Sequence, residues 1–281
     1  MLDYLLSVLY GIVEGITEWL PISSTGHLII LEELLPMKIQ PQVWSLFLVV
    51  IQLGAILATV ILFWNKIWPF QKYDKSQGVK SIFKTDSWML WFKVAVASIP
   101  GVFFKLLGLD EICDKYFYNG FGVAIALAVF GVAFIVIEHF NKKRTPKYSN
   151  LGEVTFLLAT YIGLFQLLAA AFPGTSRSGA TIIGALILGA SRVAASEFTF
   201  VLAIPAMLGA SLFEFKDFLE ADVIISNKEI AILVIGVAVA FAVSVAAIKF
   251  LMGYIKKRDF TAFGYYRIIL GIIVLLYFIL K

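Results

Sequence analysis

Apolar residues run in long blocks along most of this chain, and short polar clusters divide the blocks. Six blocks approach or reach the roughly 20 mostly apolar residues that a helix needs to cross a bilayer. They lie at about residues 44–64, 88–109, 121–137, 198–213, 230–248 and 262–280. The pattern therefore predicts an all-α, polytopic membrane protein.

Two further apolar blocks are each interrupted by a proline, at Pro21 and at Pro173. Proline lacks an amide proton and disfavours a helical conformation at the preceding residue, so each block is expected to form two short helices. An arm over residues 22–35 would be about 21 Å long, which is short of the ~30 Å hydrocarbon core. We therefore predict two re-entrant helix pairs, one opening each half of the chain.

The order of elements repeats: a proline-broken pair, then three spans. We expect a single membrane domain over residues 1–281 with about ten helices, built from one repeat at 1–140 and a second at 151–281. Three spans per repeat is an odd number, so the second repeat must be inverted relative to the first, as in folds whose broken helices meet near the midplane. Local matches at a spacing of 152 residues are Gly11-Ile-Val-Glu14 with Gly163-Leu-Phe-Gln166 and Pro21-Ile-Ser-Ser24 with Pro173-Gly-Thr-Ser176.

Composition supports the membrane assignment. The chain is 60% hydrophobic and 15% charged, with a mean hydropathy of +0.91, whereas a soluble domain is about 45–50% apolar and 25% charged. A net charge of +4 in such a chain is interpreted loop by loop, and no nucleic-acid partner is expected. The single cysteine, Cys113, excludes a disulfide framework and a cysteine-based metal cluster.

The loop charges predict an orientation. Loops 65–86, 141–152, 189–195 and 251–261 would share one side of the membrane, and the positive-inside rule puts that side in the cytoplasm and both termini outside. The basic residues of these loops are Lys66, Lys72, Lys75, Lys80, Lys84, Lys142, Lys143, Arg144, Lys147, Arg192, Lys256, Lys257 and Arg258. The opposite side is acidic, with Asp110, Glu111, Asp114, Glu214, Asp217, Glu220 and Asp222.

Polar residues cluster around the first broken helix, from Glu14 to His27. Glu14 and Glu18 are four residues apart and share a helix face, where they could hold a divalent cation, supply a base, or bind a transported proton or sodium ion. An interfacial position for one of them is the plainer alternative. Ser23, Ser24 or Thr25 could cap the next helix, and a serine could also be a phosphate ligand or nucleophile. His27 is either functional or structural.

The second broken helix carries a cluster from Phe172 to Thr181. Gly174 and Gly179 allow a ligand close to the backbone, and a helix N-terminus beside Arg177 forms an anion site. The alternative is a capped helix start with Arg177 reaching to the interface. The candidate ligand groups here are Gly174, Thr175, Ser176, Arg177, Ser178 and Thr181. Gln52 and Arg267, in otherwise apolar spans, could line the same cavity or serve helix packing.

The two motifs Glu14-Gly-Ile-Thr-Glu-Trp-Leu-Pro-Ile-Ser-Ser-Thr-Gly-His27 and Pro173-Gly-Thr-Ser-Arg-Ser-Gly-Ala-Thr181 resemble those of the bacterial undecaprenyl-diphosphatase family, also called the bacitracin-resistance protein family. The likeness covers essentially the whole chain. Further similar stretches are Val50-Ile-Gln-Leu-Gly54, Ser191-Arg-Val-Ala-Ala-Ser-Glu-Phe198 and Tyr266-Arg267.

The resemblance implies an integral phosphatase of the bacterial cell membrane. Such an enzyme hydrolyses undecaprenyl diphosphate to the monophosphate and inorganic phosphate on the outer face, with Mg²⁺ or Ca²⁺. It thereby recycles the lipid carrier for peptidoglycan and cell-wall biogenesis and confers bacitracin resistance. The family's active-site positions match Glu14, Glu18, Ser24, His27, Ser176, Arg177 and Thr181.

Our combined hypothesis is a midplane site for a polyprenyl diphosphate, open to the outside and to membrane lipid. The catalytic set is Glu14, Glu18, Ser24, His27 and Arg177, with Glu14 and Glu18 also as metal ligands. The substrate-binding set is Ser23, Thr25, Gly174, Thr175, Ser176, Ser178, Thr181, Gln52 and Arg267. Ser24 activated by His27, or water activated by His27 or a glutamate, would be the nucleophile. A lipid flippase is the rival function, and a homodimer stays open.

Overall fold

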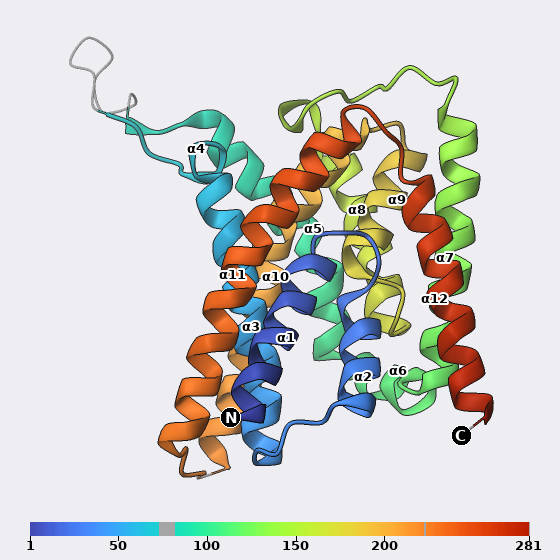
Figure 1. Ribbon diagram of the computed structural model, residues 1–281. Helices are drawn as coiled ribbons and strands as arrows, with labels where there is room; N and C mark the ends of the chain where they lie inside the picture. Colours follow the sequence, from blue (N-terminus) through green and yellow to red (C-terminus); the bar gives the residue numbers. More distant parts are fainter. Residues whose placement is uncertain (73–81, 222, 281) are drawn as a thin grey trace.

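The computed structural model describes residues 1–72, 82–221 and 223–280 (Figure 1). Lys75, Lys80 and Asp222 of the loop-charge prediction lie outside these residues. The described chain is all-α, as predicted: twelve α-helices and one short 3₁₀ helix, η2. Their bounds are α1 Leu2–Thr17, α2 Ser24–Leu34, α3 Pro41–Leu62, α4 Trp64–Ile67, α5 Thr85–Leu106, α6 Leu109–Phe117, α7 Gly120–Asn141, η2 Leu151–Glu153, α8 Phe156–Ala171, α9 Arg177–Ile187, α10 Arg192–Glu220, α11 Asn227–Ile255 and α12 Thr261–Leu280.

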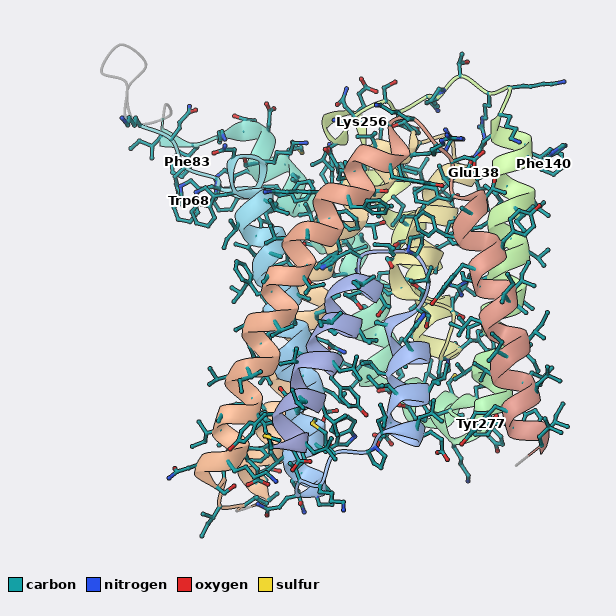
Figure 2. All side chains as sticks on the ribbon, viewed as in Figure 1. Trp68, Phe83, Glu138, Phe140, Lys256 and Tyr277 are labelled. Carbon is teal, nitrogen blue, oxygen red and sulfur yellow. The ribbon has the colours of Figure 1, made fainter. Side chains whose placement is uncertain are left out.

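Six of the helices are long and apolar enough to cross a membrane: α3, α5, α7, α10, α11 and α12. They correspond one to one to the six predicted spans. Many of their outward side chains are large and apolar, which suits contact with lipid rather than water. Trp68 and Phe83 lie at one edge of the molecule and Tyr277 near the other (Figure 2), consistent with interfacial aromatic residues on both sides.

The expectation of about ten helices was too low. The two helices that were not predicted are α4, a single turn, and α6, whose nine residues include Asp110, Glu111 and Lys115. Such a charged segment lacks the apolar run that marks a span, although its hydrophobic residues follow a helical period. In Figure 1, α6 lies at the edge of the bundle near the C-terminus, so it belongs to a rim of the molecule rather than to its core.

The proline-broken segments form two helical hairpins, α1–α2 and α8–α9. Each second arm has only 11 residues, about 16 Å of helix, too short to cross a bilayer. In Figure 1 the two hairpins come from opposite edges of the molecule, and both turns lie near mid-height. The N- and C-termini lie at the same edge. The turns therefore meet inside the bundle, where their polar side chains are shielded.

Contacts between small residues set the packing around the hairpins. Gly131 of α7 and Gly264 of α12 touch reciprocally: a Cβ on either would lie 2.7 Å from the backbone oxygen of the other. The same close approach joins Gly11 of α1 to α11 and Gly163 of α8 to α5. Each hairpin is thereby fastened along its first arm to a long helix that belongs to the other half of the chain.

The four basic loops come together at one edge, opposite the termini (Figure 1). One cavity there is lined by residues from loops 65–86 and 141–152, and another by residues from loops 141–152, 189–195 and 251–261. The loop grouping expected from parity is confirmed for the described residues.

Candidate functional site

An ion pair between the two hairpins forms the centre of the polar site. Arg177, the first residue of α9, donates from Nη2 to Oε1 of Glu18 at 2.7 Å. The Ser24 hydroxyl, at the start of α2, donates to the other oxygen of the same carboxylate, Oε2, also at 2.7 Å. Both partners are largely buried, with 16% and 9% of the Arg177 and Glu18 side chains exposed. The predicted convergence of guanidinium and carboxylate, 159 residues apart in the chain, is present.

The Arg177 guanidinium is held from a third side by α10. Its Nη1 donates to the Thr199 carbonyl at 3.3 Å, and Nη2 also lies 3.6 Å from Sδ of Met207. The Thr199 hydroxyl donates to that of Thr181, which in turn donates to the Arg177 carbonyl at 2.9 Å. This chain of contacts fixes the arginine at the N-terminus of α9, where the free amides and helix dipole favour an anion.

Glu14 lies one helical turn before Glu18, and the amide of Glu18 donates to the Glu14 carbonyl at 3.0 Å. The two carboxyl groups therefore share a face of the helix, as the spacing predicted. Glu14 is fully buried, and neither of its carboxyl oxygens has a hydrogen-bond partner among the described residues. A buried carboxyl without donors costs several kcal/mol as an anion, so this position calls for a cation.

His27 makes two short contacts. Its Nδ1 lies 2.7 Å from the Ser23 carbonyl, and its Nε2 lies 2.7 Å from the Tyr266 hydroxyl. A carbonyl only accepts, so a neutral ring carries its proton on Nδ1 and accepts from the tyrosine at Nε2. The two rings are also stacked, with an interplanar angle of 6°. Both ring nitrogens are thus engaged away from the Ser24 hydroxyl.

Arg267 joins the two turns to each other. Its guanidinium is fully buried and donates from Nη1 to the Pro21 carbonyl at 3.1 Å and from Nη2 to the carbonyls of Gly174 and Thr175 at 2.9 and 2.8 Å. A longer bond runs from Nε to the Leu127 carbonyl. The sequence suggested substrate binding or packing, and these contacts describe a strut between proline-broken turns.

Both turns have the same backbone conformation. Ser23 and Ser176 are the two non-glycine residues with positive φ in the part of the chain that the structure describes, at 76° and 72°. Each caps the helix that follows, accepting at Oγ from the amide three residues on, that of Gly26 or Gly179. The local correspondence is therefore Ser23 with Ser176, a spacing of 153, and the predicted alignment of Ser24 with Ser176 is one residue out of register.

The remaining predicted residues differ in position. Ser178 is buried and donates to the Glu18 carbonyl at 3.1 Å, and its hydroxyl lies 3.1 Å from that of Ser176. Thr175 is fully buried, and its hydroxyl is unpartnered within the described ranges. Thr25 is exposed and Gln52 half-buried; no contact ties either of them to the Arg177–Glu18 pair.

Three further side chains touch the site and were not among the predicted site residues: Tyr266, Thr199 and Met207. Tyr266 stood in a motif, beside Arg267, but no spacing argument connects it to a histidine 239 residues away. Thr199 and Met207 belong to an apolar span with no polar pattern of their own, and they act on Arg177 only through tertiary packing.

Comparison with known proteins gives a consistent result. The sequence profile of a family described as Bacitracin resistance protein BacA matches residues 7–273. An undecaprenyl-diphosphatase of Enterococcus faecalis is 54% identical over 275 residues, which cover 98% of this chain and 97% of that protein. Those of Desulfitobacterium hafniense and Acetivibrio thermocellus are 53% and 52% identical, over 97% and 99% of this chain and 95% and 99% of their own lengths.

Proposed function

Because the chain belongs to the Bacitracin resistance protein BacA family of undecaprenyl-diphosphatases, we propose that the Arg177–Glu18–Ser24 cluster is where it hydrolyses its substrate. The protein is a multi-pass membrane enzyme that converts undecaprenyl diphosphate to undecaprenyl phosphate and inorganic phosphate, and this activity accounts for bacitracin resistance. The observation that carries the location is the 2.7 Å contact of Arg177 with Glu18, beside the Ser24 hydroxyl.

The diphosphate would bind at the start of α9. Arg177 supplies a planar fork for two phosphate oxygens, and the N-terminus of α9 adds its dipole, with the Ser176 hydroxyl beside it. Phosphoryl transfer needs chiefly positioning and charge neutralisation from a protein. In the structure Glu18 pairs with the guanidinium, so a bound diphosphate would replace part of this contact.

Ser24 is the proposed nucleophile and Glu18 its base. The serine Oγ attacks the terminal phosphorus while its proton passes to Oε2 of Glu18, the atom it already contacts. The bond from that phosphorus to the bridging oxygen breaks, and undecaprenyl phosphate leaves. Glu18 passes this proton to the departing phosphate and is again a carboxylate. Water then attacks the phosphoserine and gives its proton to Glu18, the bond from phosphorus to Oγ of Ser24 breaks, and inorganic phosphate leaves. Glu18 returns the proton to Oγ, which restores Ser24.

This assignment revises the sequence hypothesis in which His27 activates Ser24. Both nitrogens of His27 are bound elsewhere, to the Ser23 carbonyl and the Tyr266 hydroxyl. We assign His27 a positioning role: it holds the carbonyl of the residue before the nucleophile and thereby orients the Ser24 backbone. Tyr266 supports it by donating to Nε2 and stacking on the ring.

Glu14 and Glu18 are suited to a divalent cation. The carboxyl of Glu14 is buried and unpartnered in the described structure, and Mg²⁺ is commonly bound by one or two carboxylates together with substrate phosphates and water. Among the described residues no group of three or more His, Cys, Asp or Glu side chains gathers, so the remaining ligands would be water and substrate oxygens. The cation would neutralise charge on the phosphate oxygens.

We also propose the inverted repeat and the orientation. The two hairpins share the serine conformation, and Gly11 and Gly163, 152 residues apart, pack in the same way on α11 and α5, each the second long span of a half. The basic edge would face the cytoplasm and both termini the outside. The Ser24 side of the site would then be reached from the outer leaflet.

The test is phosphate release by the purified protein in detergent, without any gradient, which also separates hydrolysis from lipid flipping. Glu18→Gln should lower kcat by about 10²–10⁴-fold, as expected for loss of a general base. Ser24→Ala should lower it by on the order of 10³-fold or more, and quenched wild-type reactions should contain a phosphoserine at residue 24. Ser45→Ala, an exposed α3 hydroxyl, is the control. A Ser24→Ala enzyme with the wild-type rate would assign the attack to water.

A further inference from the structure

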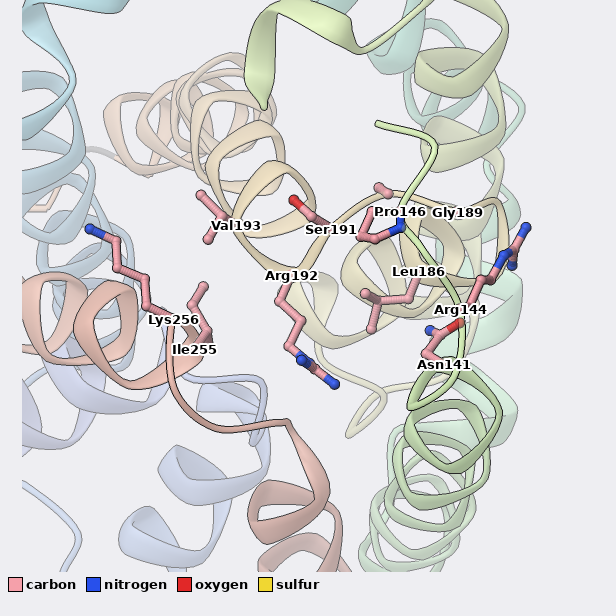
Figure 3. A pocket seen from close by; sticks show the side chains of 11 residues that line it. Asn141, Arg144, Pro146, Leu186, Gly189, Ser191, Arg192, Val193, Ile255 and Lys256 are labelled. Carbon is pink, nitrogen blue, oxygen red and sulfur yellow. The ribbon is translucent and has the colours of Figure 1, made fainter. Parts of the chain in front are cut away.

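A cavity of about 300 Å³ lies at the basic edge of the molecule, at the other end of α9 from Arg177. We name it the rim pocket. Its side chains come from three places (Figure 3): the end of α7 with the loop after it, the end of α9 with the turn into the start of α10, and the end of α11. Its lining residues are Asn141, Arg144, Pro146, Leu186, Gly189, Ala190, Ser191, Arg192, Val193, Ile255 and Lys256. Its volume lies at the lower end of the range of about 300–1,000 Å³ for small-molecule sites.

The rim pocket is electropositive. Three cations line it, Arg144, Arg192 and Lys256. Arg192 pairs with the buried Glu138 through Nε and Nη2, which leaves its Nη1 without a partner in the described structure. Arg144 donates from Nη1 to the Ile187 carbonyl, and its Nη2, like Nζ of Lys256, has no hydrogen-bond partner among the residues described. These three nitrogens therefore have no partner among the described residues, and Figure 3 shows Arg144 and Lys256 on opposite sides of the pocket, with their side chains reaching outward.

Several acceptors near the cavity are already used, while the side-chain oxygen of the lining residue Asn141 has no hydrogen-bond partner among the described residues. The Ile187 carbonyl takes Arg144, and the Gly189 carbonyl takes the amides of Lys147 and Tyr148. Both carboxylate oxygens of Glu138 accept hydrogen bonds from Arg192, and one of them also accepts from the amide of Phe260. A ligand with acceptors and negative charge therefore meets unsatisfied donors and few competing acceptors, the arrangement that favours a phosphate group.

The walls also carry apolar side chains, those of Leu186, Val193 and Ile255. A free phosphate ion would make no apolar contact with these side chains, whereas a lipid presents a phosphate group and hydrocarbon together. Basic pockets between transmembrane helices are typical binding sites for anionic lipid headgroups. We propose that the rim pocket binds the phosphate headgroup of an anionic phospholipid, in the leaflet on the basic side of the molecule. This site is separate from the hydrolytic one.

The experiment is native mass spectrometry of the full-length protein in detergent, titrated with a short-chain phosphatidylglycerol. The double variant Arg144→Gln/Lys256→Gln should bind it about 25-fold more weakly, since each basic residue near an anionic headgroup contributes about 1 kcal/mol, or fivefold. Lys143→Gln/Lys257→Gln is the matched control: it removes the same charge from adjacent exposed positions outside the lining, and its affinity should change less than twofold.

Equal losses in the two double variants would reduce the effect to general surface charge and overturn the proposal. Arg144→Gln also removes the bond to Ile187, so Lys256→Gln alone, at an exposed and unpartnered side chain, is a second test with an expected fivefold loss. An unchanged affinity there would also refute the site. Glycerol 3-phosphate and phosphatidylcholine distinguish the ligands: equal binding of glycerol 3-phosphate would assign the pocket to soluble phosphates, and equal binding of phosphatidylcholine would remove the need for net negative charge.

Discussion

Replacing Arg267 with methionine tests whether this residue links the two proline-broken turns structurally or binds the substrate. The change keeps an unbranched side chain but leaves the carbonyls of Pro21, Gly174 and Thr175 without their donor. Three hydrogen bonds from a charged donor amount to about 4–9 kcal/mol at 1.5–3 kcal/mol each. The variant also no longer buries a charged group, and the lost desolvation cost offsets several kcal/mol of this destabilisation. We expect a net loss of about 2–5 kcal/mol in the free energy of unfolding.

The assay is thermal unfolding of the purified protein in detergent, combined with kinetics normalised to folded enzyme. Arg267→Met should unfold at a clearly lower temperature, with KM for the lipid diphosphate within about twofold of wild type, since no substrate contact is lost. Arg267→Lys should rescue little, because an ammonium cannot span both turns as the guanidinium fork does. Arg258→Met, at an exposed arginine before α12, is the control. Wild-type stability with KM raised tenfold would refute the strut and restore Arg267 to the substrate-binding set.

Three other substitutions test the site and its surroundings. Tyr266→Phe removes the donor to Nε2 of His27 and should lower kcat about fivefold, the value of one hydrogen bond of about 1 kcal/mol, without changing KM or the unfolding temperature; an unchanged kcat would end the positioning role of His27. Glu14→Gln should raise the Mg²⁺ concentration for half-maximal activity at least about tenfold, measured by titration after chelation, and an unaltered metal requirement would move the cation elsewhere. Glu138→Gln should destabilise the protein by about 1–3 kcal/mol, less than loss of a fully buried pair because 30% of the Arg192 side chain is exposed, while kcat per folded enzyme stays unchanged; a lowered kcat with intact stability would contradict this reading.

The spans and the broken hairpins were predictable because both depend on local chemistry. A run of about 20 apolar residues has few alternatives to a membrane helix, and Pro21 and Pro173 interrupt a helix wherever they stand. The helix α6 was missed because Asp110 and Glu111 suggest a loop. The helix α6 has only nine residues, and its apolar side chains lie on one face. A search for long apolar runs does not detect such a short amphipathic helix.

Residue types identified the candidate site, but not the division of roles within it. Glu18 and Arg177 were expected to meet because the two proline-broken segments that carry them were predicted to converge near the midplane. The role of Arg267 depends on backbone carbonyls, which every residue has, so no sequence signal separates a strut from a ligand. The partner of His27 likewise depends on the packing of α12 against the first turn.

The matching conformations of Ser23 and Ser176 have a consequence for how chemistry is divided between the two hairpins. On equivalent backbone positions, the first turn continues with Ser24 and the second with Arg177; where one has His27, the other has Ala180. In the mechanism that we propose, one backbone conformation thus positions the attacking group in the first hairpin and the phosphate-binding arginine in the second. A symmetric assembly of two copies of either hairpin would duplicate one function and lack its complement, so the asymmetry between the halves is what makes a complete enzyme from a single chain.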